Sequence, residues 1–396
     1  MWIPYKTDYV IVEMQISMAE GIKKIAGVAD PFTLIDNIAK YSKDSVMKKF
    51  DNCVRHLRNQ LMGTTYALDS TIVETDKDFP GCGMTKRKKE DSEDESSEVI
   101  YGFKLFILYE VKSRIVIAMD IVPANENDSN YFLPIIKKGI KNVGKERIKL
   151  VIADRGFIDG AQLWELKYKL NIDFIIPAKS NMTVREDAIK LRSGYEKDKK
   201  NIAQWKYGKD TCQGYGVEGL LSYFEYNPPG TKNNKRTNGT AINAVVVTTW
   251  RGKSVTPGKE TVLLTSLPVD DAAVVASGYR QRSLIENSGF RELKQAAYLK
   301  CLPRRTGETA ENSAYLHIML CVFAHTFFYA FLGWRKKKRN KDTNIVCLRK
   351  WRREESINEK KTILVISEGK YYALFDIWEI LDILGVEQKY RIRMNC

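Results

Sequence analysis

The chain has 396 residues, of which 44% are hydrophobic and 29% charged, which is ordinary for a folded soluble protein and sets aside a disordered or fibrous one. The net charge of +15 favours a polyanionic partner, most simply nucleic acid, with anionic lipid as the rival. The first residues lack the apolar segment of a signal peptide, and the seven Cys are scattered without CxxC pairs. We therefore expect reduced thiols and a cytoplasmic location.

The first 62 residues predict a small, basic helical unit. Residues 13–27 and 30–62 look helical, and in the second run apolar residues recur at spacings of three and four, with many Lys and Arg between them. Asp30 before Pro31 indicates a helix start. Two interpretations stay open, a unit that grips DNA and a helical cap on the main domain.

From residue 64 the pattern predicts strands. Residues 64–75 form a strand with Asp69 near its end, and the purely polar residues 85–98 form a solvated loop. Residues 99–111 and 114–122 are rich in β-branched and aromatic side chains and predict an antiparallel hairpin. A helix follows, starting near Asp128 or Asn130.

A second group of elements alternates strand and helix. The apolar strand 148–154 ends on Asp154, a helix follows over 161–171, and 173–178 is another buried strand. Asp159 and Gln162 form a possible capping box for that helix. Short apolar strands that alternate with helices predict an α/β fold with parallel pairing and both sheet faces covered.

The rest of the chain predicts a β-rich stretch, then helices, then a basic tail. Residues 180–262 combine polar hairpins with apolar runs, and a last strand closes this stretch before helices resume near Asp270. The apolar run 314–334 is long enough to span a bilayer, but His317 and His325 lie within it. A buried helix of a large core explains the run equally well, and we expect no membrane association.

Two strand-end carboxylates and one helical carboxylate are candidate metal ligands. Asp69 and Asp154 follow strands whose ends meet at one edge of a sheet. On the helix 279–294, Arg282 and Glu286 share a face, which makes Glu286 the better third ligand than Glu292. Such a set suits two Mg²⁺ or Mn²⁺ ions about 4 Å apart on a phosphodiester, while an ordinary solvated helix with an Arg282–Glu286 pair is the alternative. The DNA phosphates would be contacted by Tyr279, Arg282 and Lys294.

With these residues in place, the chain resembles the DDE transposases of prokaryotic insertion sequences, in particular the family-four group with the signature Y-x2-R-x3-E-x6-K. "YRQRSLIE" at 279–286 fits Y-x2-R-x3-E, and "ALDST", "ADRGF" and "LLTSLP" stand where that family has similar stretches. The likeness covers 64–334. It implies Asp69, Asp154 and Glu286 as the catalytic triad.

The resemblance also implies a ribonuclease H-like core, a mixed sheet flanked by helices and interrupted by a β-rich insertion. We accordingly divide the chain into a helical N-terminal DNA-binding unit (1–62), a first core part (63–179), the insertion (180–268), a second core part with the Glu helix (269–334) and a basic C-terminal region (335–396).

One departure from the signature concerns Lys294, which seven residues rather than six separate from Glu286. On a regular helix Lys294 would turn away from Glu286. A π-bulge or break between Asn287 and Phe290 would bring it back, since a wide turn absorbs one residue and Gly289 is a poor helix former. The alternative is an unbroken helix, with Arg155 contacting the phosphate instead.

In related transposases a Trp of the insertion stacks on a flipped base, and Trp250 is the candidate here. Packing of Trp250 in a hairpin core is the competing interpretation.

The expected function is cleavage of donor DNA at terminal inverted repeats and transfer of the 3′-hydroxyl into target DNA. The resemblance implies a homodimer in the DNA complex, in a prokaryotic cytoplasm and associated with the nucleoid. A nuclease of the same fold without strand transfer, and a non-catalytic DNA-binding derivative, are the alternatives.

Overall fold

The computed structural model describes residues 40–88, 97–191, 194, 202–231, 239–252, 258, 260–300, 302, 307, 309–339, 362–367 and 370–376. The chain divides into two compact units, one formed by Met1–Asn37 with Val346–Cys396 and one by Ile38–Ile345. In the first unit, strands β11 (Thr362–Ser367) and β12 (Lys370–Asp376) form an antiparallel pair. The predicted helix at 13–27 and the basic stretch beyond Arg339 lie outside the described residues.

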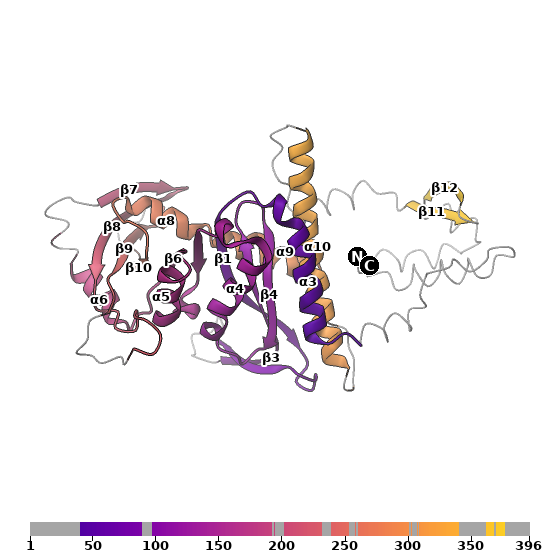
Figure 1. Ribbon diagram of the computed structural model, residues 1–396, viewed down its shortest axis with the longest axis horizontal. Coiled ribbons are helices and arrows are strands. Elements are labelled where there is room, and N and C mark those ends of the chain that lie inside the picture. The colour runs from indigo at the N-terminus through magenta and orange to yellow at the C-terminus, as the bar shows by residue number, and fades with distance from the viewer. Residues whose placement is uncertain are drawn as a thin grey trace. The chain divides into compact units, whose positions relative to one another are not determined.

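The second unit is built on one ten-stranded mixed sheet (Figure 1). The strand order is β2-β3-β1-β5-β6-β10-β9-β8-β7, and β4 also pairs with β3. The strands are β1 (Thr65–Thr75), β2 (Gly83–Lys88), β3 (Ser97–Glu110), β4 (Ile115–Pro123), β5 (Leu150–Ala153), β6 (Asp173–Pro177), β7 (Ile202–Tyr207), β8 (Asp210–Leu220), β9 (Ile242–Trp250) and β10 (Thr261–Thr265).

Parallel pairing is confined to the centre of this sheet. β5 runs parallel to β1 on one side and to β6 on the other, and the other neighbours are antiparallel. The predicted hairpin is confirmed as β3 and β4. The strands of the predicted insertion do not form a separate sheet, because β10 pairs with β6 and extends the central sheet.

Helices cover both faces of the sheet, as the pattern of short apolar strands predicted. A large core packs α3, α4, α5, α6 and α10 against the sheet, with α4 beside Leu108 of β3 and α10 beside Tyr109, the next residue, which points to the opposite face. A smaller core packs α8 against the sheet through Val245, Leu263 and Val275. The helices are α3 (Lys43–Leu57), α4 (Phe132–Val143), α5 (Gly160–Tyr168), α6 (Thr183–Lys190), α8 (Ala272–Arg280), α9 (Arg291–Gln295) and α10 (Ala310–Arg339), with a π-helix, η5 (Ile285–Phe290). The short 3-10 turns are η1 (Arg58–Gln60), η2 (Asp128–Tyr131), η3 (Lys145–Arg147) and η4 (Arg155–Phe157).

Local sequence explains several helix boundaries. The helix expected near Asp128 begins as the 3-10 turn η2 and continues as α4, whose third residue, Pro134, is tolerated in a first turn. Asp159 caps α5 by accepting from the Gln162 N–H at 3.0 Å. The predicted capping box is only half formed, because Gln162 instead bonds the Leu133 N–H and the Ser129 carbonyl and so ties α5 to the start of α4.

The predicted loop over residues 85–98 is shorter than expected. Residues 85–88 belong to β2 and pair with the first part of β3, which begins at Ser97. Only 89–96 of that stretch lie outside the described residues. Charged residues are stable there because β2 is an edge strand with one side in solvent, where an ion pair such as Arg87–Glu74 at 2.7 Å forms on the surface.

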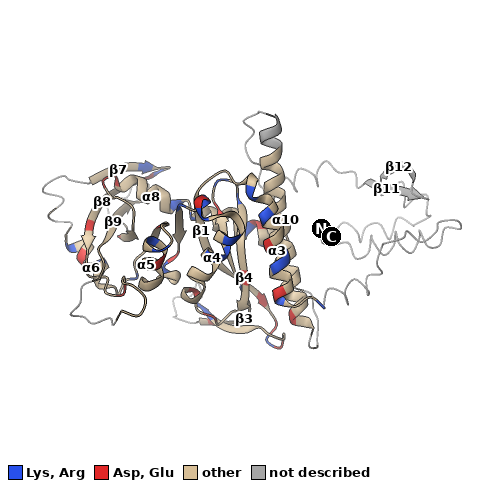
Figure 2. Cartoon of the chain, viewed as in Figure 1, with Lys and Arg blue, Asp and Glu red and all other residues tan. Residues whose placement is uncertain are grey.

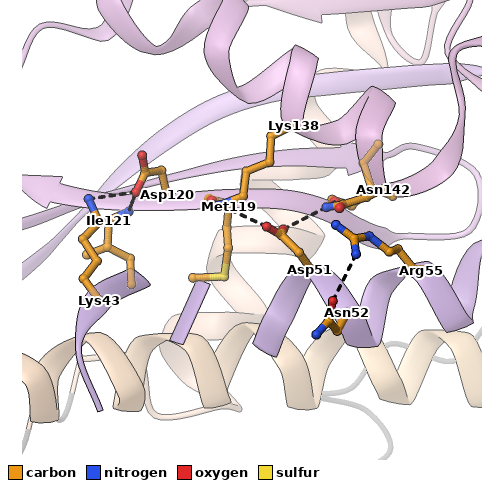
Figure 3. A network of polar contacts seen from close by, with 10 residues as sticks. Lys43, Asp51, Asn52, Arg55, Met119, Asp120, Ile121, Lys138 and Asn142 are labelled. Atoms are coloured by element: carbon orange, nitrogen blue, oxygen red, sulfur yellow. Dashed lines mark hydrogen bonds and ion pairs between the residues drawn. The ribbon is translucent and has the colours of Figure 1, made fainter. Parts of the chain in front are cut away.

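Helix α3 is tied to the main sheet (Figure 3). Its Asp51 accepts from Asn142 Nδ2 at 2.8 Å and pairs with Lys138 at 3.6 Å, both on α4. Its Lys43 pairs with Asp120 of β4 at 3.0 Å. Figure 2 shows Lys and Arg interspersed with Asp and Glu along this helix. These contacts favour the helical-cap interpretation for residues 43–57, while whether residues 1–62 act as a unit remains a prediction.

Helix α10 contains the apolar run 314–334, for which a membrane span and a buried core helix were the two interpretations. Within the described residues, Ala310–Trp334 is the one segment long and apolar enough to cross a membrane, and 61% of its most apolar window is buried inside the protein. It packs on β4, α3 and α9, with His325 and Thr326 fully buried (Figure 1). The segment therefore has the burial of a core helix.

Candidate active site

Asp69 and Asp154 lie side by side where the parallel pairing of β1 and β5 ends. The last paired residues of that ladder are Leu68 and Ala153, so each Asp is the next residue of its chain. The expectation that Asp69 ends its strand was wrong, because β1 continues against β3 with Asp69 opposite Ile107. Asp154 directly follows the end of its strand and is the N-cap of η4. The two carboxylates share the edge where parallel strands of α/β sheets form sites.

Glu286 reaches this edge from η5, held by Arg282. Arg282 Nη1 donates to Asp69 Oδ2 at 2.8 Å, and its Nη2 donates to Glu286 Oε1 at 2.8 Å. The predicted pair of Arg282 with Glu286 is thus confirmed, and Arg282 also joins that pair to Asp69. Asp69 is buried, whereas the Glu286 side chain is 50% exposed and open to a ligand.

The electrostatics of Asp69 show that the three carboxylates are neighbours. The pKa of Asp69 is raised from 3.8 to about 7, mainly by burial and in smaller part by the nearby charges of Asp154 and Glu286. Arg282 and the hydrogen bond from the Ser70 N–H act in the opposite direction but do not outweigh burial. A buried carboxyl group with a raised pKa is typical of a functional site, because a bound cation would stabilise its charged form.

Arg282 and Tyr279 complete the wall of the site. Burial alone would lower the pKa of Arg282, but Asp69, Tyr279, Asp154 and Glu286 outweigh it and raise that pKa. Burial raises the pKa of Tyr279 to about 12, against the influence of Arg282, so the phenol stays protonated and can donate a hydrogen bond. Tyr279, Arg282 and Glu286 are therefore brought together as the sequence predicted.

The π-bulge predicted from the extra residue is confirmed as η5. The Arg291 N–H donates to the Glu286 carbonyl, an i→i+5 bond, and regular i→i+4 bonding resumes with the Ala296 N–H and the Glu292 carbonyl. The extra residue is absorbed in this wide turn. The turn spans Ile285–Phe290 and so starts before Asn287, because Glu286 itself is part of it.

Lys294 lies among cations. Burial lowers the pKa of Lys294, and the nearby charges of Lys300 and Arg87 lower it further, while Glu74 raises it. These neighbours place Lys294 beside the far half of β1 rather than in the ion pairs around Asp69. Arg87 and Lys300 were not among the candidate residues, since β2 and the turn after α9 approach Lys294 only in the folded chain.

Arg155 and Trp250 occupy different surroundings. Arg155 is exposed and directly follows Asp154, so it is at hand for a ligand of the site. Trp250 is half-buried as the last residue of β9, opposite Thr211 of β8. In the neighbouring strand β7, Tyr207 is 56% exposed, and the Arg280 guanidinium lies 3.5 Å from its ring centroid. Stacking of Trp250 on a flipped base stays a prediction.

The three carboxylates carry the oxygen ligands that a divalent cation prefers. Within the part of the chain that the structure describes, no three His, Cys, Asp or Glu side chains form a ready metal-binding group. The donor chemistry nevertheless fits, because Asp69, Asp154 and Glu286 offer hard oxygen ligands and repel one another. Arg282 provides the positive charge for two of them in this arrangement.

The mixed sheet flanked by helices, with acidic residues at its central edge, defines a ribonuclease H-like fold of the transposase type, as predicted. The family described as "Transposase DDE domain" matches residues 61–323, most of the chain. The chain therefore belongs to the DDE transposase domain family.

Comparison with other proteins adds little to this assignment. Among curated protein sequences, none matches the chain. One similar solved structure is a piggyBac transposase synaptic complex with hairpin DNA, determined by cryo-EM. It shares 12% sequence identity at a TM-score of 0.39, over 82% of this chain and 58% of that one. The chain thus spans less than two thirds of that protein.

Proposed function

We propose that this protein is a DNA transposase of the family-four type, which cuts donor DNA at terminal inverted repeats and joins the freed 3′-hydroxyl to target DNA. The observation that carries the proposal is the arrangement of Asp69, Asp154 and Glu286 around Arg282, inside a transposase DDE domain. The signature residues Tyr279, Arg282 and Glu286 face one site, which supports the finer assignment.

The residues of the site have separate roles in this proposal. Asp69, Asp154 and Glu286 would hold two Mg²⁺ or Mn²⁺ ions, which when bound would stabilise the attacking and leaving oxygens of a phosphodiester. Arg282 and Tyr279 orient the scissile phosphate through hydrogen bonds, since Arg282 is already the donor nearest to two of the carboxylates. Arg155, exposed next to Asp154, and Trp250 contact the DNA beside the cleavage point.

The two chemical steps use the same site. In the first, water attacks the phosphate at the element end, and the 3′ oxygen leaves as a hydroxyl. In the second, that 3′-hydroxyl attacks a target phosphate, and the 3′ oxygen of the target strand leaves. Two copies of the chain, one for each element end, would pair the ends for joint insertion.

A direct test uses the DNA that flanks the gene. Protein, Mg²⁺ and a labelled fragment carrying the flanking inverted repeat are incubated with a circular target. Joined products support the transposase, whereas cuts without joining support a nuclease of the same fold. Binding without cutting supports a non-catalytic derivative.

DNA binding is expected to weaken steeply with salt. The net charge of +15 comes from an excess of Lys and Arg. Each Lys or Arg that contacts a DNA phosphate releases counterions from the DNA. We expect the dissociation constant for an end fragment to rise by about tenfold or more between roughly 50 mM and 200 mM salt. Fluorescence anisotropy over a salt series measures it, and a flat dependence would contradict the nucleic-acid interpretation.

Lys294→Ala is expected to reduce end binding by about tenfold and to lower the salt slope by about one. The reason is the group of cations around Lys294, in which burial and two like charges lower the lysine pKa and a phosphate would restore it. Lys137→Ala is the control, because that Lys is an exposed partner of Glu165 on the α4 surface. Full cleavage and an unchanged salt slope in Lys294→Ala would rule out a phosphate contact.

A further inference from the structure

A polar cluster with a buried centre of Glu292, His325 and Tyr329 lies beside the wide turn that carries Glu286. Tyr329 of α10 donates its hydroxyl to Glu292 Oε2 at 2.7 Å, and Arg114 Nη1 donates to that hydroxyl at 3.2 Å. His325 Nε2 lies 3.3 Å from Glu292 Oε2 and 3.4 Å from the Ser288 carbonyl oxygen. We call Arg114, Glu292, His325 and Tyr329 the His325 cluster.

His325 acts as a hydrogen-bond donor through Nε2. Both groups that face Nε2 are acceptors, a carboxylate and a carbonyl, so Nε2 must carry the proton and donate. Nδ1 has no hydrogen-bond partner among the described residues. The imidazole therefore acts as one donor, pointed at the junction of η5 and α9.

The backbone hydrogen bonding changes its register at that junction. At Glu286 the ladder has i→i+5 bonds, at Glu292 it has i→i+4 bonds, and Ser288 lies between them. A donor from another element stabilises a carbonyl at such a change of register, where regular backbone bonding is interrupted. His325 supplies this donor from a different helix, and Glu292 orients it.

Tyr109 of β3, a neighbour of the His325 cluster, also packs beside the turn. Gly289 lies within η5 and is buried, and a Cβ added there would stand 3.6 Å from the Tyr109 ring. Tyr109 in turn lies beside His325, with ring centroids 6.3 Å apart. Since apolar side chains often stabilise a core as well as a buried ion pair does, the polar cluster is explained better by the geometry it imposes than by stability.

We propose that His325 and Glu292 are positioning residues that fix the wide turn of η5 and thereby hold Glu286 toward Asp69 and Asp154. The proposal rests on the proposed function only for its consequence in catalysis. The hydrogen bond from His325 to the Ser288 carbonyl fixes the position of the wide turn along the helix. Without it, the turn can migrate along the helix and carry the Glu286 carboxylate away from the other two. A displacement of about 1 Å is enough to slow a reaction about a hundredfold.

The test compares three variants of the full chain. His325→Phe keeps the volume and loses the donor, and His325→Gln keeps a donor near the same point. His317→Phe is the matched control, because His317 is another buried histidine on α10, bonded instead to the Tyr298 carbonyl at 3.1 Å. Each variant is measured for amide hydrogen exchange over 285–292, thermal stability, end binding and single-turnover cleavage.

We expect His325→Phe to increase exchange over 285–292 and to slow cleavage by about tenfold to a hundredfold, with end binding within about twofold of the original. His325→Gln should recover most of both properties. His317→Phe should lower the melting temperature similarly, yet leave exchange over 285–292 and the cleavage rate nearly unchanged.

Two results would overturn the proposal. One is unchanged exchange over 285–292 in His325→Phe, and the other is an equal effect of His317→Phe on exchange and on cleavage. The exchange measurement requires no catalysis. If the original protein cuts no DNA, the proposed function fails, while the exchange comparison still decides whether His325 holds the turn.

Discussion

Asp69→Asn, Asp154→Asn and Glu286→Gln are each expected to reduce cleavage by at least about a hundredfold and to leave end binding nearly intact. All three carboxylates meet around Arg282, and Asp69 responds electrostatically to both of the others. The amide replacements keep size and hydrogen bonding but lose the charge that a divalent cation requires. Affinity for DNA comes from Lys and Arg instead, so binding should survive.

The measurement is single-turnover cleavage of an end fragment with Mg²⁺, alongside anisotropy binding. Glu165→Gln is the control, because Glu165 forms surface ion pairs with Lys137 and Lys169, and such pairs contribute little. It should cut at nearly the original rate. Any one of the three site variants that cuts at that rate would show that its residue does not belong to the triad.

Asp69→Asn is also expected to stabilise the metal-free protein above neutral pH. Burial raises the pKa of Asp69 from 3.8 to about 7 in the folded chain. Between these values the folded protein keeps a proton that the unfolded chain has released, so stability falls as pH rises through this window. Asparagine carries no charge at any pH and avoids the loss, which is on the order of a few kcal/mol at pH 8.

Urea unfolding with a chelator at pH 5 and pH 8 checks this. The stability advantage of Asp69→Asn should widen from pH 5 to pH 8. Glu165→Gln provides a control of opposite sign, since a hydrogen bond from Lys137 lowers the pKa of Glu165, and its loss should slightly destabilise the protein at pH 8. If Asp69→Asn raised the free energy of unfolding equally at pH 5 and pH 8, the pKa of Asp69 would not be raised in the folded protein.

Local features of the fold were predictable because their causes lie within a few residues. The β3–β4 hairpin follows from β-branched runs around a short turn, and the Asp159 cap of α5 follows from one side chain. The Arg282–Glu286 pair follows from helical spacing. The wide turn of η5 was predictable only beside the family-four signature, against which one residue before Lys294 is extra and is absorbed near Gly289.

The sequence by itself determined which residues carry charge at the site and the elements from which they come. Tertiary structure decided where those elements meet. Asp69 lies within its strand and still faces the site, because the parallel ladder with β5 stops one residue earlier. Arg87 reaches Lys294, and His325 reaches Ser288, from elements far apart in the chain. Such contacts depend on how sheet and helices pack, and neither residue spacing nor local propensity specifies that packing.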